Sequence, residues 1–167
     1  MKTLKVICEI SNKHCHLREE TLKKFLPKVT KLRDVSQPGQ WVSNEYFNDG
    51  TEKFRVILPA RSEDQFELSL TDWIRRFGRD KEPLWKRNKE AGYVVTLRHL
   101  HISTTQAKEL GLKDGDYVAI RNNGIRTGTL EKVLVRVAEN FDLRVHLDTD
   151  EANALYIKNG DIIDLLI

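Results

Sequence analysis

Four of the five histidines in this 167-residue chain occur in two H-x-H pairs, in the segments SNKHCHL and RHLHIS. In a β-strand, residues i and i+2 point to the same side, so each pair presents two imidazoles to one place. A single such pair is more often a structural or surface feature than a metal site, because imidazoles readily satisfy themselves by hydrogen bonding. Two pairs at matching points of the two halves favour metal binding instead.

A further residue with metal-ligand chemistry follows each pair. Glu67 in QFELSLTD and His146 in RVHLDTD both lie on predicted strands that run directly into a helix, so they occupy equivalent positions of an internal duplication. Three protein ligands with an open position are typical of catalytic metal sites, whereas structural zinc sites normally close all four positions. Five imidazoles and one carboxylate favour zinc, with cobalt, iron or nickel as alternatives. The predicted sets are His14, His16 and Glu67 for one metal, and His99, His101 and His146 for the other.

An arginine near the first set has the chemistry of an anion ligand. Arg61 in LPARSEDQFE ends the strand before Glu67 and is expected to lie across a hairpin from it. A guanidinium beside a Lewis-acidic metal suits phosphate, because its fork matches two oxygens and its charge does not titrate away. An ordinary surface arginine at a strand end is the competing interpretation. Arg98 precedes His99 and points to the opposite strand face, which makes it the weaker candidate. No G-x-S-x-G elbow, Walker loop or G-x-G-x-x-G motif occurs, which argues against covalent catalysis and nucleotide hydrolysis.

Short alternating segments separated by turns predict the elements that must position these residues. The strands include LKVICEI, KFRVILPA, QFELSL, YVVTLRHLHI, YVAIR, TLEKVLVRV, FDLRVHL and IIDLLI. Helices are expected at 18–26, at TDWIRRF before Gly78, after the cap Ser103, and after the cap Asp148. Cys15, between the first two imidazoles, is expected to pack in the core. The fold class is therefore mainly β with short helices (α+β), as two internally related small β-barrel halves capped by helices with antiparallel or mixed pairing.

Composition limits the organisation and the partners. Hydrophobic residues at 40% and charged residues at 32% are ordinary soluble values, and no apolar run approaches a membrane span. We expect residues 1–80 to form the first half, 81–92 a linker and 93–167 the second half, with strands exchangeable between the halves. A net charge of +3 does not indicate nucleic acid. The basic residues gather in 75–89, which is either a solvated linker or a docking strip for a phosphorylated ligand. No signal peptide is evident, and we expect a cytoplasmic protein that contacts neither nucleic acid nor membrane.

Together these motifs resemble a known family. SNKHCHL, QPGQW, ILPARSEDQFELSLTD, LRHLHIS, LGLKDGD and VHLDTDEANA are similar, in order, to the phosphate propanoyltransferases of the propanediol-utilisation type. The resemblance implies two helix-capped β-barrel halves, two Zn²⁺ ions and reversible transfer of a short acyl group, such as propanoyl or acetyl, between coenzyme A and phosphate. It maps the six metal ligands onto the residues named above and makes Arg61 the phosphate ligand. The coenzyme A contacts that it implies are Ser11, Arg33, Arg55 and Asn153, with Arg33 standing where a lysine is usual.

The chain also departs from the family pattern. Lys13, Cys15, Arg18 and Leu58 replace the usual residues, and KEPLWKRNKEAG replaces a Gly/Ser-rich segment between the halves. These changes leave the acyl-chain preference and the mode of coenzyme A binding open. The absence of an N-terminal extension argues against packaging in a microcompartment. A homodimer is compatible with the sequence.

Two other functions share some of these features. A dinuclear metallohydrolase of a phosphate or thioester would use the same metals and Arg61 but activate water. A β-barrel binding or regulatory protein would explain the LGLKDGDYVAI turn and the basic segment without catalysis. Coenzyme A release that requires phosphate separates transfer from hydrolysis, and binding of acyl-coenzyme A but not DNA separates either enzyme from a regulator.

Overall fold

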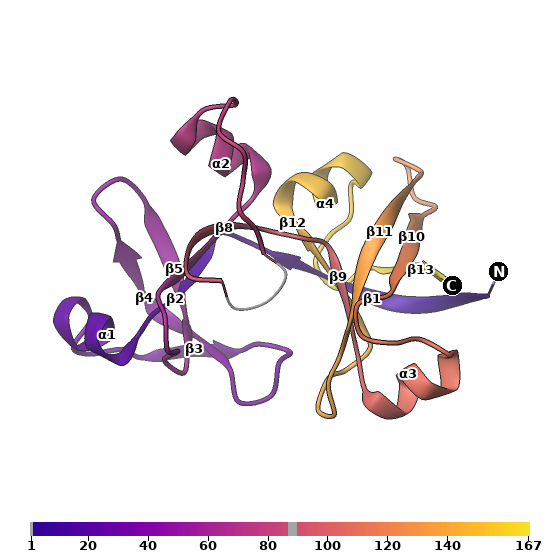
Figure 1. The fold of residues 1–167 in the computed structure, drawn as a ribbon, viewed down its shortest axis with the longest axis horizontal. Helices are drawn as coiled ribbons and strands as arrows, with labels where there is room; N and C mark the ends of the chain where they lie inside the picture. Colours follow the sequence, from indigo (N-terminus) through magenta and orange to yellow (C-terminus); the bar gives the residue numbers. More distant parts are fainter. Residues whose placement is uncertain (1, 87–89) are drawn as a thin grey trace. The chain divides into compact units, whose positions relative to one another are not determined.

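The structure is a computed structural model that describes residues 2–86 and 90–167. Contacts divide the chain into two compact units, one formed by Met1–Ser11 with Leu97–Ile167 and the other by Asn12–Thr96. Each unit is built around β-strands with short helices at their ends, as the colours of Figure 1 trace along the chain. The predicted fold class, mainly β with short helices, is confirmed.

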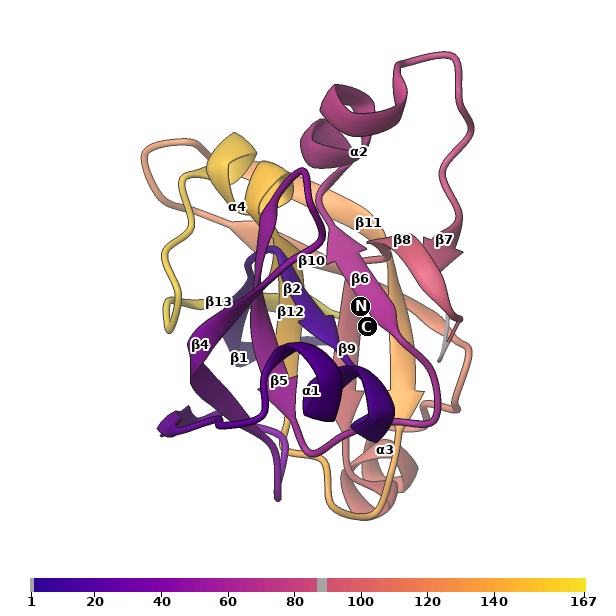
Figure 2. The ribbon, with the colours of Figure 1, turned by 90° about the vertical axis from the view of Figure 1, so that its left-hand side faces the viewer.

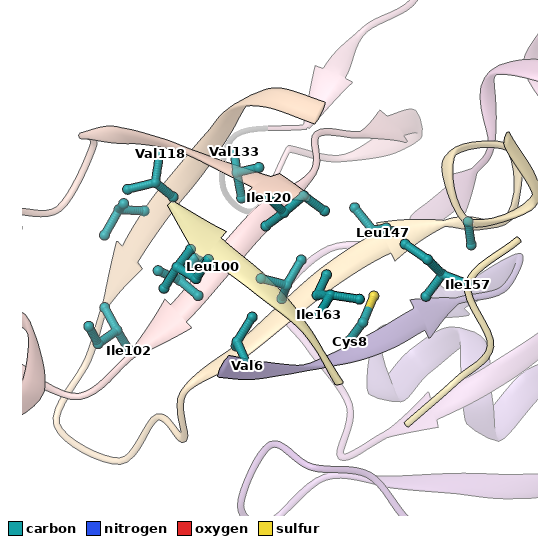
Figure 3. Close-up of a cluster of buried hydrophobic side chains, with 14 of the residues drawn as sticks. Val6, Cys8, Leu100, Ile102, Val118, Ile120, Val133, Leu147, Ile157 and Ile163 are labelled. Atoms are coloured by element: carbon teal, nitrogen blue, oxygen red, sulfur yellow. The ribbon is translucent and has the colours of Figure 1, made fainter. Parts of the chain in front are cut away.

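The first unit is a closed barrel in the strand order β1-β12-β9-β11-β10-β13. Its strands are β1 (Thr3–Ser11), β9 (His99–Ile102), β10 (Tyr117–Asn122), β11 (Gly128–Val137), β12 (Arg144–Asp148) and β13 (Ile162–Leu166). Alternate residues of these strands point inward and pack together, including Cys8, Leu100, Ile120 and Ile163 (Figure 3). Closure leaves no open sheet edge among these strands, and the buried apolar face is the main stabilising contribution.

The two helices of this unit begin at caps that the sequence predicts. Ser103 caps α3 (Thr104–Leu110) and Asp148 caps α4 (Thr149–Leu155), and each forms a complete capping box. Because Ser103 directly follows β9 and Asp148 is the last residue of β12, the strand ends that carry the histidines are fixed to helix starts.

The second unit holds a seven-stranded sheet among the described residues, in the order β3-β4-β5-β2-β6-β8-β7. Its strands are β2 (His14–His16), β3 (Lys31–Asp34), β4 (Trp41–Asn48), β5 (Lys53–Leu58), β6 (Gln65–Leu68), β7 (Trp85–Lys86) and β8 (Gly92–Thr96). Helix α1 (Glu19–Phe25) follows β2, and α2 (Leu70–Phe77), capped by Ser69 and ended by Gly78, follows β6. Phe54, Val56 and Cys15 are fully buried in its apolar core, so the prediction that Cys15 packs inward is confirmed.

Two features of strand pairing differ from the expectation. KFRVILPA and QFELSL do not form a hairpin, because β2 lies between β5 and β6 and pairs with both (Figure 2). YVVTLRHLHI is not one strand, since it separates into β8 and β9, which belong to different units. The apolar positions change from odd to even numbers between Leu97 and Leu100, a local sign of the break that the single-strand prediction missed. β3 and β4 were not predicted.

The two H-x-H strands have equivalent neighbours. β2 pairs in parallel with β5 and antiparallel with β6, and β9 pairs in parallel with β11 and antiparallel with β12. The strand that precedes each H-x-H strand in sequence pairs with the opposite half: β1 with β12, and β8 with β6. Contacts therefore divide the chain just before each H-x-H motif, whereas composition places a linker at 81–92. The exchange of strands between the two sequence halves stays a prediction.

Candidate metal centres

The first H-x-H pair and Glu67 converge on one face of the second unit. His14 lies directly opposite Glu67 in the antiparallel pairing of β2 and β6. The Nε2 atoms of His14 and His16 lie 3.3 and 3.5 Å from the same oxygen, Oε1 of Glu67. All three side chains are buried, and one ligand atom from each lies within 4.8 Å of the others. Side chains of this chemistry and spacing can surround a divalent cation.

Hydrogen bonds orient the first imidazole. His14 Nδ1 lies 2.7 Å from the carbonyl oxygen of Asn12, which can only accept, so Nδ1 carries the proton and donates. Nε2 of the same ring faces Glu67. A ligating histidine usually donates its other ring N–H to a backbone carbonyl or carboxylate in this way.

The protonation of the cluster follows from its burial. Desolvation lowers the pKa of His16 to about 3, and the neighbouring His14 and Arg61 act in the same direction against the opposing effect of Glu67. His16 is therefore neutral at pH 7, which is the form that binds metals. Burial alone would raise the pKa of Glu67, but Lys86 and His14 outweigh it and hold that pKa well below its ordinary value. Glu67 is consequently an anion.

Two further side chains contact Glu67. The Thr96 hydroxyl donates to Oε2 at 2.9 Å, and the Lys86 ammonium donates to Oε1. The Lys86 side chain is only 10% exposed. Thr96 comes from β8, which pairs in parallel with β6, and Lys86 comes from β7, which pairs in parallel with β8.

The second cluster repeats the geometry with three imidazoles. His99 lies opposite His146 in the antiparallel pairing of β9 and β12, as His14 lies opposite Glu67. The ring of His146 is centred 4.9 Å from that of His99 and 4.4 Å from that of His101. His99 Nδ1 donates to the Leu97 carbonyl at 2.8 Å, matching the His14 bond to Asn12. The ligand atoms of the three side chains again lie within 4.8 Å of one another.

Glu9 and Phe141 support the imidazoles of the second cluster. Glu9 on β1 is the register partner of His146, and its Oε2 lies 3.8 Å from His146 Nδ1. The Phe141 ring stacks on His101 at 4.0 Å between centroids. Burial lowers the pKa of His146 well below its ordinary value, with His99 and His101 adding to the effect, so this ring is neutral.

The ring nitrogens of the second cluster show whether a metal ion would fit between them. His146 Nε2 is buried and has no hydrogen-bond partner among the described residues. A buried polar atom without a partner costs free energy, so in a native protein it calls for an ion, a water or a ligand. The neutral ring offers this nitrogen as a lone pair beside two other imidazoles, which fits a zinc-type cation.

Arg61 is held beside the first cluster. Its backbone N–H donates to the Leu17 carbonyl, and its Nη1 donates to Gln65 Oε1 at 3.1 Å. Gln65 is the register partner of His16, so this hydrogen bond fixes the guanidinium next to the imidazole pair. Arg61 is partly buried, unlike an ordinary surface arginine.

The remaining sequence candidates lie elsewhere. Arg98 forms an ion pair with Glu151 at 2.7 Å, in keeping with its weaker standing as an anion ligand. Ser11 ends β1, and Asn153 is exposed on α4, both in the barrel unit. In the other unit, Arg33 is exposed on β3 and Arg55 lies on β5. The Arg55 guanidinium stacks over the Tyr46 ring, 4.8 Å from its centroid.

Sequence reasoning missed Lys86, Thr96 and Glu9. No local pattern marks them, because β7, β8 and β1 bring them to the clusters through strand pairing. The one available signal was the basic segment 75–89, and its described residues do not form one surface. Arg75 is exposed. Arg76 and Lys86 are partly buried, in ion pairs with Asp49 and Glu67 respectively, so the interpretation as a solvated linker is wrong for these two side chains. Arg87 and Lys89 lie outside the described residues.

A closed barrel, a second β-sheet and two register-equivalent ligand clusters define a mainly β protein with two candidate metal centres. The chain belongs to the phosphate propanoyltransferase family, whose model matches residues 7–80 and 82–158. It is therefore an acyltransferase with phosphate as a substrate class, and the predicted family and enzyme class are confirmed.

Individual relatives match over most of their length. The phosphate propanoyltransferase of Sebaldella termitidis is 36% identical, covering 91% of this chain and 83% of that protein. Those of Thermotoga maritima and Priestia megaterium are 34% and 38% identical, over 95% and 91% of this chain and 87% and 81% of the relatives. The crystal structure of the rationally designed apDPBB_sym_79 protein matches with a TM-score of 0.32 and 20% identity, over 50% of this chain and 89% of its own, a score too low to support any inference. Among the described residues, no helix combines the length and the apolar character that crossing a bilayer requires.

Proposed function

We propose that this chain is a zinc-dependent phosphate acyltransferase that moves a short acyl group, such as propanoyl or acetyl, reversibly between coenzyme A and inorganic phosphate. The observation that carries the proposal is the pair of equivalent clusters, each built from an H-x-H strand and a ligand directly opposite its first histidine. Membership of the phosphate propanoyltransferase family supplies the reaction class.

The six ligands would hold two metal ions. His14, His16 and Glu67 would hold one, and His99, His101 and His146 the other, through side chains that lie close together and are buried, except for the partly buried His146. The neutral state of His16 and His146 and the anionic state of Glu67 suit this role, because a protonated ligand cannot bind a metal. When bound, zinc supplies Lewis acidity and an affinity for thiolate sulfur.

Arg61 would bind the attacking phosphate. Its Nη1 donates to Gln65, which holds the guanidinium beside the imidazole pair, and the fork of an arginine matches two oxygens of a phosphate. A phosphate oxygen attacks the thioester carbonyl carbon, the carbon–sulfur bond breaks, and the electron pair leaves with the coenzyme A thiolate. The products are acyl phosphate and coenzyme A. No general base is required, since phosphate is already anionic at neutral pH, and Arg61 contributes by positioning it.

Coenzyme A would be contacted by Ser11, Arg33, Arg55 and Asn153, the positions that the family resemblance assigns. All four are polar or cationic side chains; Arg33 and Asn153 are exposed, and the Arg55 guanidinium contacts Tyr46. Charged donors of this kind suit the phosphates of coenzyme A.

The test is a coenzyme A release assay with propanoyl-coenzyme A, with and without inorganic phosphate, on protein whose metal content is measured in parallel. We expect release to require phosphate, acyl phosphate to accumulate, and about two zinc ions to be bound per chain. Phosphate-independent release would identify a hydrolase instead. Protein without stoichiometric metal that is still fully active would refute zinc dependence.

A further inference from the structure

The loop that carries Arg61 is tied at both ends to the turn that follows the first H-x-H strand. This β5–β6 loop (59–64) connects two strands of the sheet, and its two middle residues are exposed. At one end, the Arg61 N–H donates to the Leu17 carbonyl at 2.9 Å. At the other end, the Arg18 N–H donates to Asp64 Oδ1 at 2.7 Å. Because this turn directly follows β2, both bonds hold the loop in place relative to the first ligand cluster.

Asp64 supplies the cap for the start of helix α1. The residue before this helix is Arg18, whose side chain has only donors and cannot accept from the helix N–H groups. Asp64 Oδ1 accepts from the Arg18 N–H, and Oδ2 accepts from the hydroxyl of the buried Thr21 at 2.7 Å. In α3 and α4 the corresponding acceptor comes from the helix itself, whereas here it comes from the loop that carries Arg61. The helix start and the loop therefore cannot separate without breaking these bonds.

Asp64 also fixes the next residue, Gln65. The Asp64 carbonyl accepts from the Gly92 N–H at 2.8 Å, where the parallel pairing of β6 with β8 begins. Gln65 is buried, its side-chain amide donates to the Glu90 carbonyl, and its Oε1 accepts from Arg61 Nη1 at 3.1 Å. The Arg61 guanidinium is thus held by the residue next to Asp64, and its backbone is held by the loop that Asp64 anchors.

We propose that Asp64 is a positioning residue for Arg61: by tying the β5–β6 loop to the start of α1, it places the guanidinium beside His16, where phosphate binds. This inference rests on the proposed function in one respect, namely that Arg61 binds the attacking phosphate. Asp64 itself does not bind phosphate, because a carboxylate repels it. Its negative charge and its positioning role therefore act in opposite directions on phosphate affinity, and this makes the two separable.

The first variant is Asp64→Ala, which should raise the KM for phosphate about tenfold or more, because a misplacement of about 1 Å can cost about a hundredfold. Electrostatics alone predicts the opposite sign, since removal of a negative charge favours an anion. The KM for propanoyl-coenzyme A and the zinc content should be unchanged. A purely structural loss would reduce the amount of active protein, and with it the apparent kcat, and leave the KM for phosphate as it was.

Two conservative variants separate hydrogen bonding from charge. In Asp64→Asn the amide oxygen still accepts from the Arg18 N–H and the NH₂ group can donate to the Thr21 hydroxyl, so the KM for phosphate should recover most of the loss. Thr21→Val removes one of the two bonds with little change of side-chain shape, and should raise that KM by a smaller factor. This variant keeps the proposal testable if Asp64→Ala does not fold. The matched control Glu63→Ala removes the exposed carboxylate that precedes Asp64, and leaves the KM unchanged.

A double-mutant cycle tests whether Asp64 acts through Arg61. In an Arg61→Ala chain, Asp64→Ala should have no further effect on the KM for phosphate, whereas independent contributions would multiply. An unchanged or lowered KM in Asp64→Ala, or equal effects with and without Arg61, would overturn the proposal.

Binding of radiolabelled inorganic phosphate to the full chain, as purified, measures the same series without acyl transfer. Phosphate affinities in the expected order in a chain that transfers no acyl group would refute only the proposed function. An active chain whose phosphate KM ignores Asp64 would refute only this inference. A chain that neither binds phosphate nor transfers an acyl group would refute both.

Discussion

The two ligand clusters share a strand register but differ in charge. In both, an H-x-H strand places its first histidine opposite the third ligand, and a backbone carbonyl accepts from the Nδ1 of that histidine. The first cluster contains a carboxylate that already pairs with an ammonium, whereas the second contains three imidazoles. Position in the repeat thus sets geometry, while residues from neighbouring strands set the electrostatic environment and hence the expected metal affinity.

The strongest test of the comparison removes one ligand from each cluster. His14→Ala and His146→Ala should each reduce acyl transfer by roughly a hundredfold or more, because loss of a direct ligand exceeds the 10- to 100-fold cost typical of outer contacts. Steady-state rates and zinc content measured together check this. If one variant keeps its activity, only the other cluster takes part in catalysis.

Arg61 tests whether the first cluster is the place where phosphate binds. Arg61→Ala should lower kcat/KM for phosphate by about a hundredfold, the order expected for loss of a partly buried, positioned donor to an anion. Arg61→Lys should recover only part of this, since an ammonium cannot bind two oxygens in a fork. Zinc content should be unchanged in both.

The control for this test is Arg75→Ala, which removes an exposed arginine of α2 that pairs with Asp72. It should leave the phosphate dependence unaltered. An equal loss with Arg75→Ala would mean that general positive charge, and not the position of Arg61, governs the rate.

The residues behind the ligands provide a finer comparison. Glu9→Gln should weaken zinc binding at the second cluster about tenfold. The reason is that Oε2 of Glu9 lies 3.8 Å from His146 Nδ1, where its negative charge supports the ligating imidazole. Thr96→Val should weaken the first cluster by a similar factor through loss of the bond to Glu67 Oε2. Zinc titrations measure each effect separately when the other cluster is disabled: Glu9→Gln is tested in a His14→Ala chain and Thr96→Val in a His146→Ala chain. If either change acts on the other cluster, the two sites are not independent.

The smallest expected effect concerns the acid stability of the metal-free protein. The pKa of His16 is about 3 in the folded chain against 6.5 ordinarily, so below pH 6.5 the unfolded chain takes up a proton that the folded chain does not. This contribution to stability is complete above pH 6.5 and is lost as the pH falls toward 3. Between pH 7.5 and 5.5, His16 alone should cost about 1 kcal/mol.

Denaturant unfolding at the two pH values checks this value. His16→Gln, which cannot titrate, should show a smaller loss over the same range. An equal loss in the variant would place the acid sensitivity elsewhere in the chain.

Many strands, the helix starts and the histidine pairs of this protein can be predicted from the sequence, because the signals for them are local. Alternation marks the strands, Ser103 and Asp148 mark the helix starts, and the spacing of His99 and His101 requires that they share a face. The repeat adds one non-local inference, the equivalence of Glu67 and His146, which the register of β6 and β12 bears out.

What the sequence could not supply is the pairing partner of each strand. β8 and β9 follow each other closely in sequence, yet the two strands join different sheets, and β2 inserts between β5 and β6 where a hairpin was expected. Strand pairing brings Lys86 and Thr96 to Glu67, and Glu9 to His146, from segments that are distant in sequence. Side-chain identity and period determined which residues could bind a metal. Only the tertiary structure decided which charges surround them, because hydrogen bonds between distant strands, and not local preferences, choose those neighbours.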